Sequence, residues 1–182
     1  MPGITLIFND KSTKKLEKEY RKINKKVGKN ILSIKKDLKP HITLMYFQKE
    51  KGKKNLEKIN NAISKIAKKY KSYKLIVNGL AIFIRGDNYI LYFTTPYNNV
   101  LQNIHNDVWK ELGNINTYSN HYSPLQFTPH ITIPIFKSNK TNTFKIMSEL
   151  SKIKFDFELD VSALAYLTGN LNTPEVYFKK KL

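Results

Sequence analysis

The chain has no cysteine, and this absence excludes several kinds of chemistry. Without thiols there is no disulfide framework, no thiolate metal site and no cysteine nucleophile. A chain without disulfides suits a reducing compartment, and the N-terminal residues lack the long apolar run of a signal peptide. We therefore expect a cytoplasmic protein. No segment is apolar over the length of a bilayer, so no membrane association is expected.

Glycine is scarce as well. With only seven glycines, the chain contains no Walker-type or dinucleotide-binding glycine loop. It also has no G-x-S-x-G segment, the signature of one large group of serine hydrolases. Its histidines and acidic residues are not clustered at the spacing of metal ligands. We accordingly expect neither a metal nor an organic cofactor.

Acidic residues are few in comparison with lysine. The chain carries 32 Lys and Arg against 14 Asp and Glu, a net charge of +18. Residues 1–91 hold 23 basic and 7 acidic side chains, whereas residues 92–182 hold 9 and 7. Clustered cations attract phosphates, which favours a nucleic-acid partner. Only Arg21 and Arg85 are arginine, however, and an A+T-rich genome would also raise the lysine content. Both interpretations stay open.

Apolar periodicity divides the chain into two similar halves. Short apolar runs predict strands at residues 4–8, 41–47, 74–84, 89–94, 130–136, 155–161 and 175–180. Apolar residues at helical spacing predict helices over residues 16–27, 56–70, 101–112 and 141–152. Pro96 is a candidate for opening the third helix. Pro134 removes a backbone donor, so its strand is expected to lie at an edge or to be interrupted there.

Each half contains the same hexapeptide pattern. Residues 39–44 read Lys-Pro-His-Ile-Thr-Leu and residues 128–133 read Thr-Pro-His-Ile-Thr-Ile. Side chains alternate along a strand, so the histidine and threonine of each motif point to one face and the aliphatic residues point to the other. The repeat of strands and helices around both motifs predicts two lobes that pack across one cleft.

Two histidines with neighbouring hydroxyls suit phosphoryl transfer. Because imidazole titrates near neutral pH, one of His41 and His130 can accept a proton while the other donates one. Thr43 and Thr132 can donate hydrogen bonds to the non-bridging phosphate oxygens. His121 also fits a loose H-x-[ST] pattern but lies in an expected loop. His105 follows an apolar helical position and is expected to be a partly exposed packing residue.

The paired motifs, which lie 89 residues apart, resemble those of the two-histidine (2H) phosphoesterase superfamily. This group includes 2′-5′ RNA ligases, cyclic nucleotide phosphodiesterases, 2′,5′-oligoadenylate phosphodiesterases and phage anti-CBASS nucleases. The resemblance implies that His41 and His130 are catalytic, that Thr43 and Thr132 bind phosphate, and that no metal is needed. We expect an α+β fold: a single bilobal domain over residues 1–182 in which two antiparallel sheets form a central groove with helices outside. Lobe one would come mainly from residues 1–84 and lobe two from residues 87–182, with strand exchange between the lobes allowed.

Four aromatic residues are candidates for stacking on a nucleobase. Tyr122 and Phe127 belong to the loop before the second motif, Phe47 lies on the His41 face if alternation continues, and Tyr166 is expected near the end of a late strand. Each has an alternative role as an ordinary loop anchor or core residue.

The expected activity is metal-independent cleavage of a 2′,3′-cyclic phosphate or of a 2′-5′ or 3′-5′ linkage. RNA, an oligonucleotide or a cyclic nucleotide would be the partner, and no obligate protein partner is expected. Two alternatives are hydrolysis of cyclic oligonucleotide immune signals and a non-catalytic RNA- or nucleotide-binding module. Intact histidines and threonines in both motifs argue against the binding module.

Overall fold

The computed structural model describes residues 2–27, 39–86, 88–115, 122–134, 140–170 and 173–182. Its helices are α1 (Asp10–Val27), α2 (Lys49–Lys54), α3 (Leu56–Ala67), α4 (Asn99–Leu112) and α5 (Lys140–Leu150). Its strands are β1 (Gly3–Phe8), β2 (His41–Tyr46), β3 (Tyr73–Val77), β4 (Gly79–Arg85), β5 (Asn88–Thr94), β6 (His130–Thr132), β7 (Phe157–Asn170) and β8 (Thr173–Lys181). None of the described helices is long and apolar enough to span a membrane.

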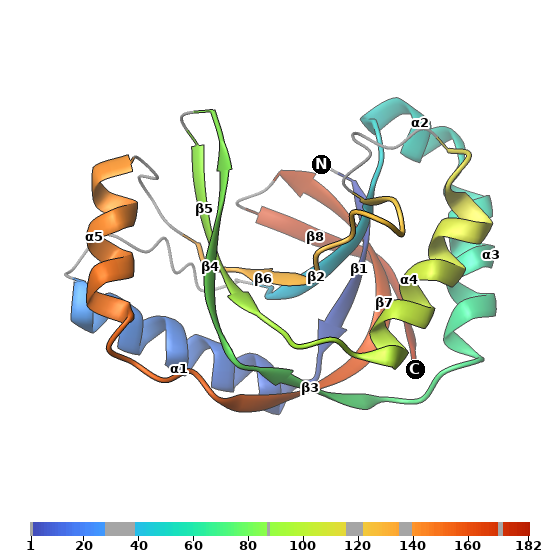
Figure 1. Ribbon diagram of the computed structural model, residues 1–182. Helices are drawn as coiled ribbons and strands as arrows, with labels where there is room; N and C mark the ends of the chain where they lie inside the picture. Colours follow the sequence, from blue (N-terminus) through green and yellow to red (C-terminus); the bar gives the residue numbers. More distant parts are fainter. Residues whose placement is uncertain (1, 28–38, 87, 116–121, 135–139, 171–172) are drawn as a thin grey trace.

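The described strands form one antiparallel sheet in the order β3-β7-β1-β2-β6-β5-β4, with β8 also paired to β7. Figure 1 shows the sheet curving, so that the β4–β5 hairpin rises on one side and β7 and β8 on the other. The helices lie outside this curve. The expected α+β class is confirmed. The two expected sheets are joined into one, because β2 and β6 pair through Ile42 and Ile131.

Each helix layer combines the two halves of the chain. α1 packs against α5 beside β5 and β6, whereas α3 packs against α4 beside β2 and β7 (Figure 1). The amphipathic pattern of α1 explains its position, because Leu16, Tyr20 and Ile23 are fully buried while its lysines face outward. The helix layers therefore do not follow a division of the chain near residue 85.

The longest expected strand, 74–84, is wrong as a single element. β3 pairs with β7 near one end of the sheet, and β4 pairs with β5 at the other. The break falls at Asn78, whose backbone N–H donates to the carbonyl of Thr94. An apolar run specifies extended backbone, but it does not specify the partner strand, so the sequence pattern could not locate this break.

Other boundaries also differ from the sequence pattern. β6 ends at Thr132 and lies between β2 and β5, so the interruption expected at Pro134 is confirmed, whereas an edge position is wrong. Helix α4 begins after Asn98, whose side-chain oxygen accepts a hydrogen bond from the Leu101 N–H, and not at Pro96. β7 runs to Asn170, well beyond the one-sided pattern at 155–161.

Candidate active site

The two histidine motifs lie side by side on neighbouring antiparallel strands. Ile42 of β2 pairs with Ile131 of β6, and both side chains are fully buried. One residue further along in each direction, His41 is level with Thr132 and Thr43 is level with His130. Since alternate side chains share a face, these four polar side chains lie together on the face opposite the isoleucine pair. We call His41, Thr43, His130 and Thr132 the quartet.

The two histidines occupy a diagonal of the quartet. Diagonal neighbours on adjacent antiparallel strands have Cα atoms about 7–8 Å apart. That spacing leaves room for one phosphate group between two imidazoles. The two threonines occupy the other diagonal, so each histidine has a hydroxyl beside it on the partner strand.

Both imidazoles are held by the same kind of hydrogen bond. Nδ1 of His41 lies 2.8 Å from the carbonyl oxygen of Lys39, and Nδ1 of His130 lies 2.8 Å from the carbonyl oxygen of Thr128. A carbonyl oxygen only accepts, so Nδ1 carries the hydrogen in each case. In the neutral form of each ring, Nε2 is therefore the nitrogen that carries the basic lone pair. The proline between donor and acceptor helps to fix this two-residue geometry.

Burial gives His41 a distinct electrostatic environment. Desolvation lowers the pKa of His41 below its ordinary value, although the hydrogen bond to the Lys39 carbonyl acts in the opposite direction. The ring is nevertheless partly exposed to solvent. His41 is therefore mainly neutral at pH 7 and suited to accept a proton through Nε2.

A bulge in β2 determines which aromatic residue faces the quartet. Thr5 of β1 pairs with Thr43, but the preceding residue Ile4 pairs with Met45, so one extra residue is inserted in β2. The alternation is thereby inverted, and Tyr46 points to the quartet face. Its hydroxyl lies 3.4 Å from the Thr43 hydroxyl, which donates to it. The sequence pattern of β2 does not predict this position of Tyr46, because the bulge arises from pairing with β1.

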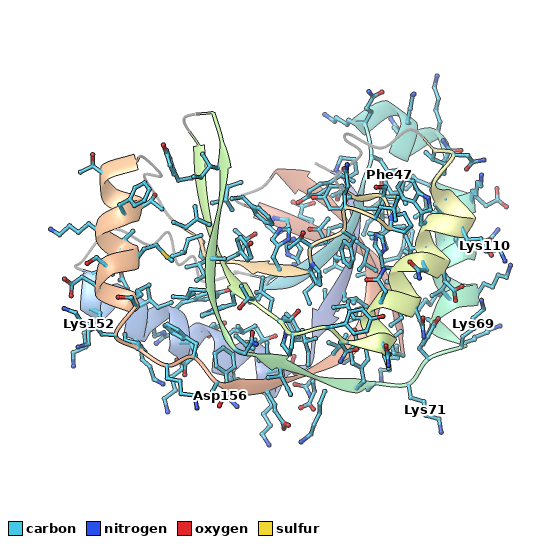
Figure 2. All side chains as sticks on the ribbon, viewed as in Figure 1. Phe47, Lys69, Lys71, Lys110, Lys152 and Asp156 are labelled. Atoms are coloured by element: carbon cyan, nitrogen blue, oxygen red, sulfur yellow. The ribbon has the colours of Figure 1, made fainter. Side chains whose placement is uncertain are left out.

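Phe47 consequently lies on the wrong face for the role expected of it. It is fully buried on the helix side of the sheet, next to Tyr166, with ring centroids 6.3 Å apart. Figure 2 shows Phe47 beside α2. Phe47 and Tyr166 line a cavity of about 770 Å³ together with Lys49 and Lys53 of α2. The structure therefore separates these two candidates from the quartet.

Tyr122 and Phe127, in contrast, lie next to His130. Together with His130 they line a cavity of about 270 Å³, whose other residues are Phe83, Ile84, Gln126 and Thr128. The ring of Phe83 meets that of His130 edge to face at 4.9 Å, and Tyr46 meets Tyr122 in the same way at 5.3 Å. We call this the aromatic cavity. It supplies rings of the kind that stack on a nucleobase.

His105 of α4 packs behind two residues that line this cavity, Phe127 and Tyr122. Its ring stacks on Phe127 with parallel planes and centroids 3.7 Å apart, and its Nε2–H donates to the Tyr122 carbonyl at 3.0 Å. The expectation that His105 is partly exposed is wrong, because its side chain is fully buried. Burial lowers its pKa to about 4. His121, the other histidine considered, lies outside the described residues.

Most described lysines project from the outer surface of the molecule. Figure 2 shows Lys69, Lys71 and Lys110 on the helix side, and Lys69 is paired with Asp107 at 3.0 Å. Within the described ranges, no group of three or more His, Asp and Glu side chains could hold a metal ion. The excess of lysines that gives the chain its net positive charge is therefore not concentrated at the quartet.

A family model for the 2′-5′ RNA ligase superfamily matches residues 16–172. This range includes all four residues of the quartet. A comparison with curated proteins finds no match.

Several solved structures share the fold over the full length of the chain. TT0787 of Thermus thermophilus has a TM-score of 0.68 at 13% identity, covering 100% of this chain and 97% of its own. E. coli LigT complexed with 3′-AMP has a TM-score of 0.62 at 12% identity, with coverages of 100% and 97%. The MHV ns2 PDE domain has a TM-score of 0.51 at 16% identity, with coverages of 98% and 99%. At these identities the likeness concerns the fold.

Proposed function

Because the chain belongs to the 2′-5′ RNA ligase superfamily, we propose that it is a phosphodiesterase that cleaves a nucleotide or oligonucleotide phosphodiester by two-histidine acid–base catalysis. One observation carries this proposal: two imidazoles and two hydroxyls lie on one face of adjacent strands, with both Nδ1 atoms bound to backbone carbonyls. The LigT structures with 3′-AMP, ATP and NADP⁺ support a nucleotide as the class of ligand.

His41 is the general base of the first step. Its lowered pKa keeps Nε2 unprotonated at neutral pH, so it removes the proton from the attacking ribose hydroxyl or water. The oxygen attacks phosphorus while the bond to the leaving oxygen breaks. His130, protonated at Nε2, donates its proton to that leaving oxygen. Proton number is balanced, since His41 ends protonated and His130 ends neutral.

If the attacking group is the adjacent 2′-hydroxyl, the first product is a 2′,3′-cyclic phosphate. A second step with the roles exchanged then opens it. His130 removes a proton from water, and His41 returns its proton to the ribose oxygen. The diagonal arrangement permits this exchange, because the two Nε2 atoms approach one phosphate from opposite sides.

Thr43 and Thr132 donate to the non-bridging oxygens, and for this the Thr43 hydroxyl turns from Tyr46 to the phosphate. Negative charge on these oxygens changes in the transition state, and preorganised hydroxyl donors stabilise it without reorganisation. Thr43 is buried and touches Tyr46, whereas Thr132 is exposed. Thr132 therefore provides the donor whose removal disturbs the fold least.

The aromatic cavity receives the base of one nucleotide. It adjoins His130, so this base belongs to the nucleotide on the leaving-group side of the scissile phosphate. Stacking on aromatic side chains tolerates any base and is worth about 1–3 kcal/mol per base. We therefore expect weak base preference.

The test is a substrate screen with the purified chain in EDTA. The panel contains 2′,3′-cyclic nucleotides, linear 2′-5′ and 3′-5′ oligonucleotides and cyclic oligonucleotides. We expect full activity in EDTA, and a loss of about 10²–10⁴-fold in His41→Asn and in His130→Asn. Thr132→Val should retain the fold by circular dichroism and lose about 10²–10³-fold in kcat.

Three outcomes of this screen would change the proposal. Strict dependence on a divalent metal would overturn the mechanism. Turnover of cyclic oligonucleotides alone would assign the alternative activity toward immune signals. Salt-sensitive RNA binding without turnover of any substrate would indicate a binding module.

A further inference from the structure

The sheet extends the quartet face beyond β2 toward the opposite edge. Two rows of paired residues cross this face from β2 through β1 and β7 to β8. The first row is Thr43–Thr5–Ala165–Lys179, and the second is His41–Ile7–Ala163–Lys181. Paired residues on neighbouring strands share a face. Each row therefore begins at a quartet residue and ends at a lysine of β8. Lys180, between the two, pairs with Leu164 and points to the other face.

The side chains that β7 contributes to these rows are small. Ala163 and Ala165 are buried and carry no side chain beyond Cβ, whereas Ile7 of β1, between His41 and Ala163, is a larger and partly buried residue. Thr5 is buried on the same face, and its hydroxyl has no hydrogen-bond partner among the described residues. Thr5 is thus a polar group in this floor whose hydrogen-bonding capacity the described part of the chain does not use.

The lysines at the end of the rows are available for an anion. Lys179 and Lys181 are exposed, and among the described residues neither takes part in an ion pair. Lys74 of β3, in contrast, is neutralised by Glu158, whose carboxylate lies 2.7 Å from its ammonium group. The C-terminal strand therefore adds uncompensated positive charge to the quartet face.

We propose that Lys179 and Lys181 bind a backbone phosphate of an oligonucleotide on the His41 side of the scissile phosphate. This inference rests on the proposed function and narrows its substrate to chains with more than one phosphate. Three inter-strand spacings of about 4.8 Å place the β8 backbone about 14 Å from β2. The four-carbon lysine stems shorten this gap. The aromatic cavity takes a base at the other end, beyond His130.

The substrate is thereby given a direction. Its leaving-group nucleotide stacks next to His130, and its backbone on the attacking side crosses the quartet face past β1 and β7 to β8. A dinucleoside monophosphate fills only the quartet and the aromatic cavity. A longer chain also reaches the lysines and gains affinity from the release of counterions.

The experiment compares Lys179→Gln/Lys181→Gln with Lys180→Gln in the full chain. Lys180 is a matched control, because it lies in the same strand, is exposed and points to the opposite face. The substrates are a dinucleoside monophosphate and the same molecule extended by one to three nucleotides on the attacking side, each measured at several salt concentrations.

We expect the ratio of kcat/KM for extended over minimal substrate to fall at least fivefold in the double variant and less than twofold in Lys180→Gln. The slope of log affinity against log salt should become shallower by about 0.7 for each phosphate that the lysines no longer neutralise. Equal effects in the two variants, or a ratio unchanged in the double variant, would overturn the inference.

A binding measurement tests the phosphate site independently of the proposed catalytic function. The probe is a fluorescent 2′-O-methyl oligonucleotide, and its anisotropy is measured with His41→Asn protein that either retains or lacks the two lysines. If no substrate is cleaved but the lysines still strengthen binding of the longer probes, only the proposed function fails. If cleavage occurs and the lysines leave probe binding unchanged, only the phosphate site fails.

Discussion

The hydroxyl of Tyr20 donates a hydrogen bond to the backbone carbonyl of Thr132, 3.1 Å away. Tyr20 lies in the middle of α1 and is fully buried, and its ring stacks on Phe93 at 5.9 Å. β6 is only three residues long and pairs with β2 through a single pair of residues. β5 holds β6 on its other side through three residue pairs, and Tyr20 adds a further hydrogen bond to the backbone of Thr132, a quartet residue.

We predict that Tyr20→Phe lowers kcat on a cleavable oligonucleotide by about 5- to 10-fold. The ring and its stacking remain, whereas the backbone of Thr132 loses one hydrogen bond worth about 1 kcal/mol. KM should change less than kcat, because the hydroxyl positions Thr132 and does not touch the substrate. The measurement is steady-state kinetics together with urea unfolding.

Tyr73→Phe is the matched control for this substitution. The Tyr73 hydroxyl is also buried but has no hydrogen-bond partner among the described residues. Removing it should leave both kcat and stability close to those of the parent chain. If Tyr20→Phe loses stability but retains full kcat, Tyr20 is structural and does not position the site.

The pH dependence of turnover should reflect the lowered pKa of His41. The base works only when unprotonated, so kcat/KM falls as the pH decreases through the pKa of His41 in the free enzyme. Burial places that midpoint below 6.5, the ordinary value for histidine. A pH–rate profile of the parent chain measures it. An acidic limb centred above 6.5 would contradict the assignment of His41 as the base.

Acid should destabilise the fold through His105. Its pKa is about 4 in the folded protein and about 6.5 when unfolded, so below pH 6.5 the unfolded chain binds a proton that the folded chain does not. Stability is therefore fully present above pH 6.5, and about 3 kcal/mol of it is lost by pH 4. Urea unfolding at a series of pH values measures this loss.

His105→Phe isolates this effect. Phenylalanine can stack on Phe127 but removes the N–H that His105 donates to the Tyr122 carbonyl, so the variant should be less stable at pH 7. Between pH 6.5 and 4 its stability should decrease less than that of the parent chain. Parallel stability curves for the two proteins would show that His105 does not titrate in this range.

Gly3 should be essential for the position of Tyr46. A Cβ at Gly3 would lie 2.7 Å from the Tyr46 ring and 2.8 Å from the Met45 carbonyl oxygen. Gly3→Ala should therefore cost about 1–3 kcal/mol in stability, and it should raise KM by displacing Tyr46 from the quartet face. Gly79→Ala is a milder comparison, since its Cβ would meet only the Thr94 hydroxyl, at 3.0 Å. Equal costs would argue against a special constraint at Gly3.

The face shared by His41 and Thr43 followed from the sequence because it depends only on the two-residue period of a strand. Continued to the end of the strand, the same two-residue period predicts Phe47 on that face, although Tyr46 occupies it. The inserted residue opposite Ile4 and Thr5 arises from pairing with β1, and a pattern within β2 contains no information about it. Local periodicity therefore located the quartet, but it did not identify the aromatic residues around it.

For the helices as well, the sequence indicates which face is buried but not which segment packs against it. The buried stripe of α1 was visible in the spacing of Leu16, Tyr20 and Ile23, whereas its partner α5 comes from the far end of the chain. The burial of His105 is not visible in the spacing of its helix, because it depends on Phe127 and Tyr122, which approach from a loop. Contacts between distant segments decide such cases, and one-dimensional spacing does not determine them.

The pairing of Ile42 with Ile131 gives the quartet an approximate two-fold axis. A free phosphate ion rotated by half a turn about this axis would meet an imidazole and a hydroxyl at equivalent positions. The catalytic groups alone thus cannot distinguish the two ends of a nucleotide chain. Enzymes that share such a centre can differ in product while keeping the same four side chains, and the surroundings of the two imidazoles are where such differences would arise.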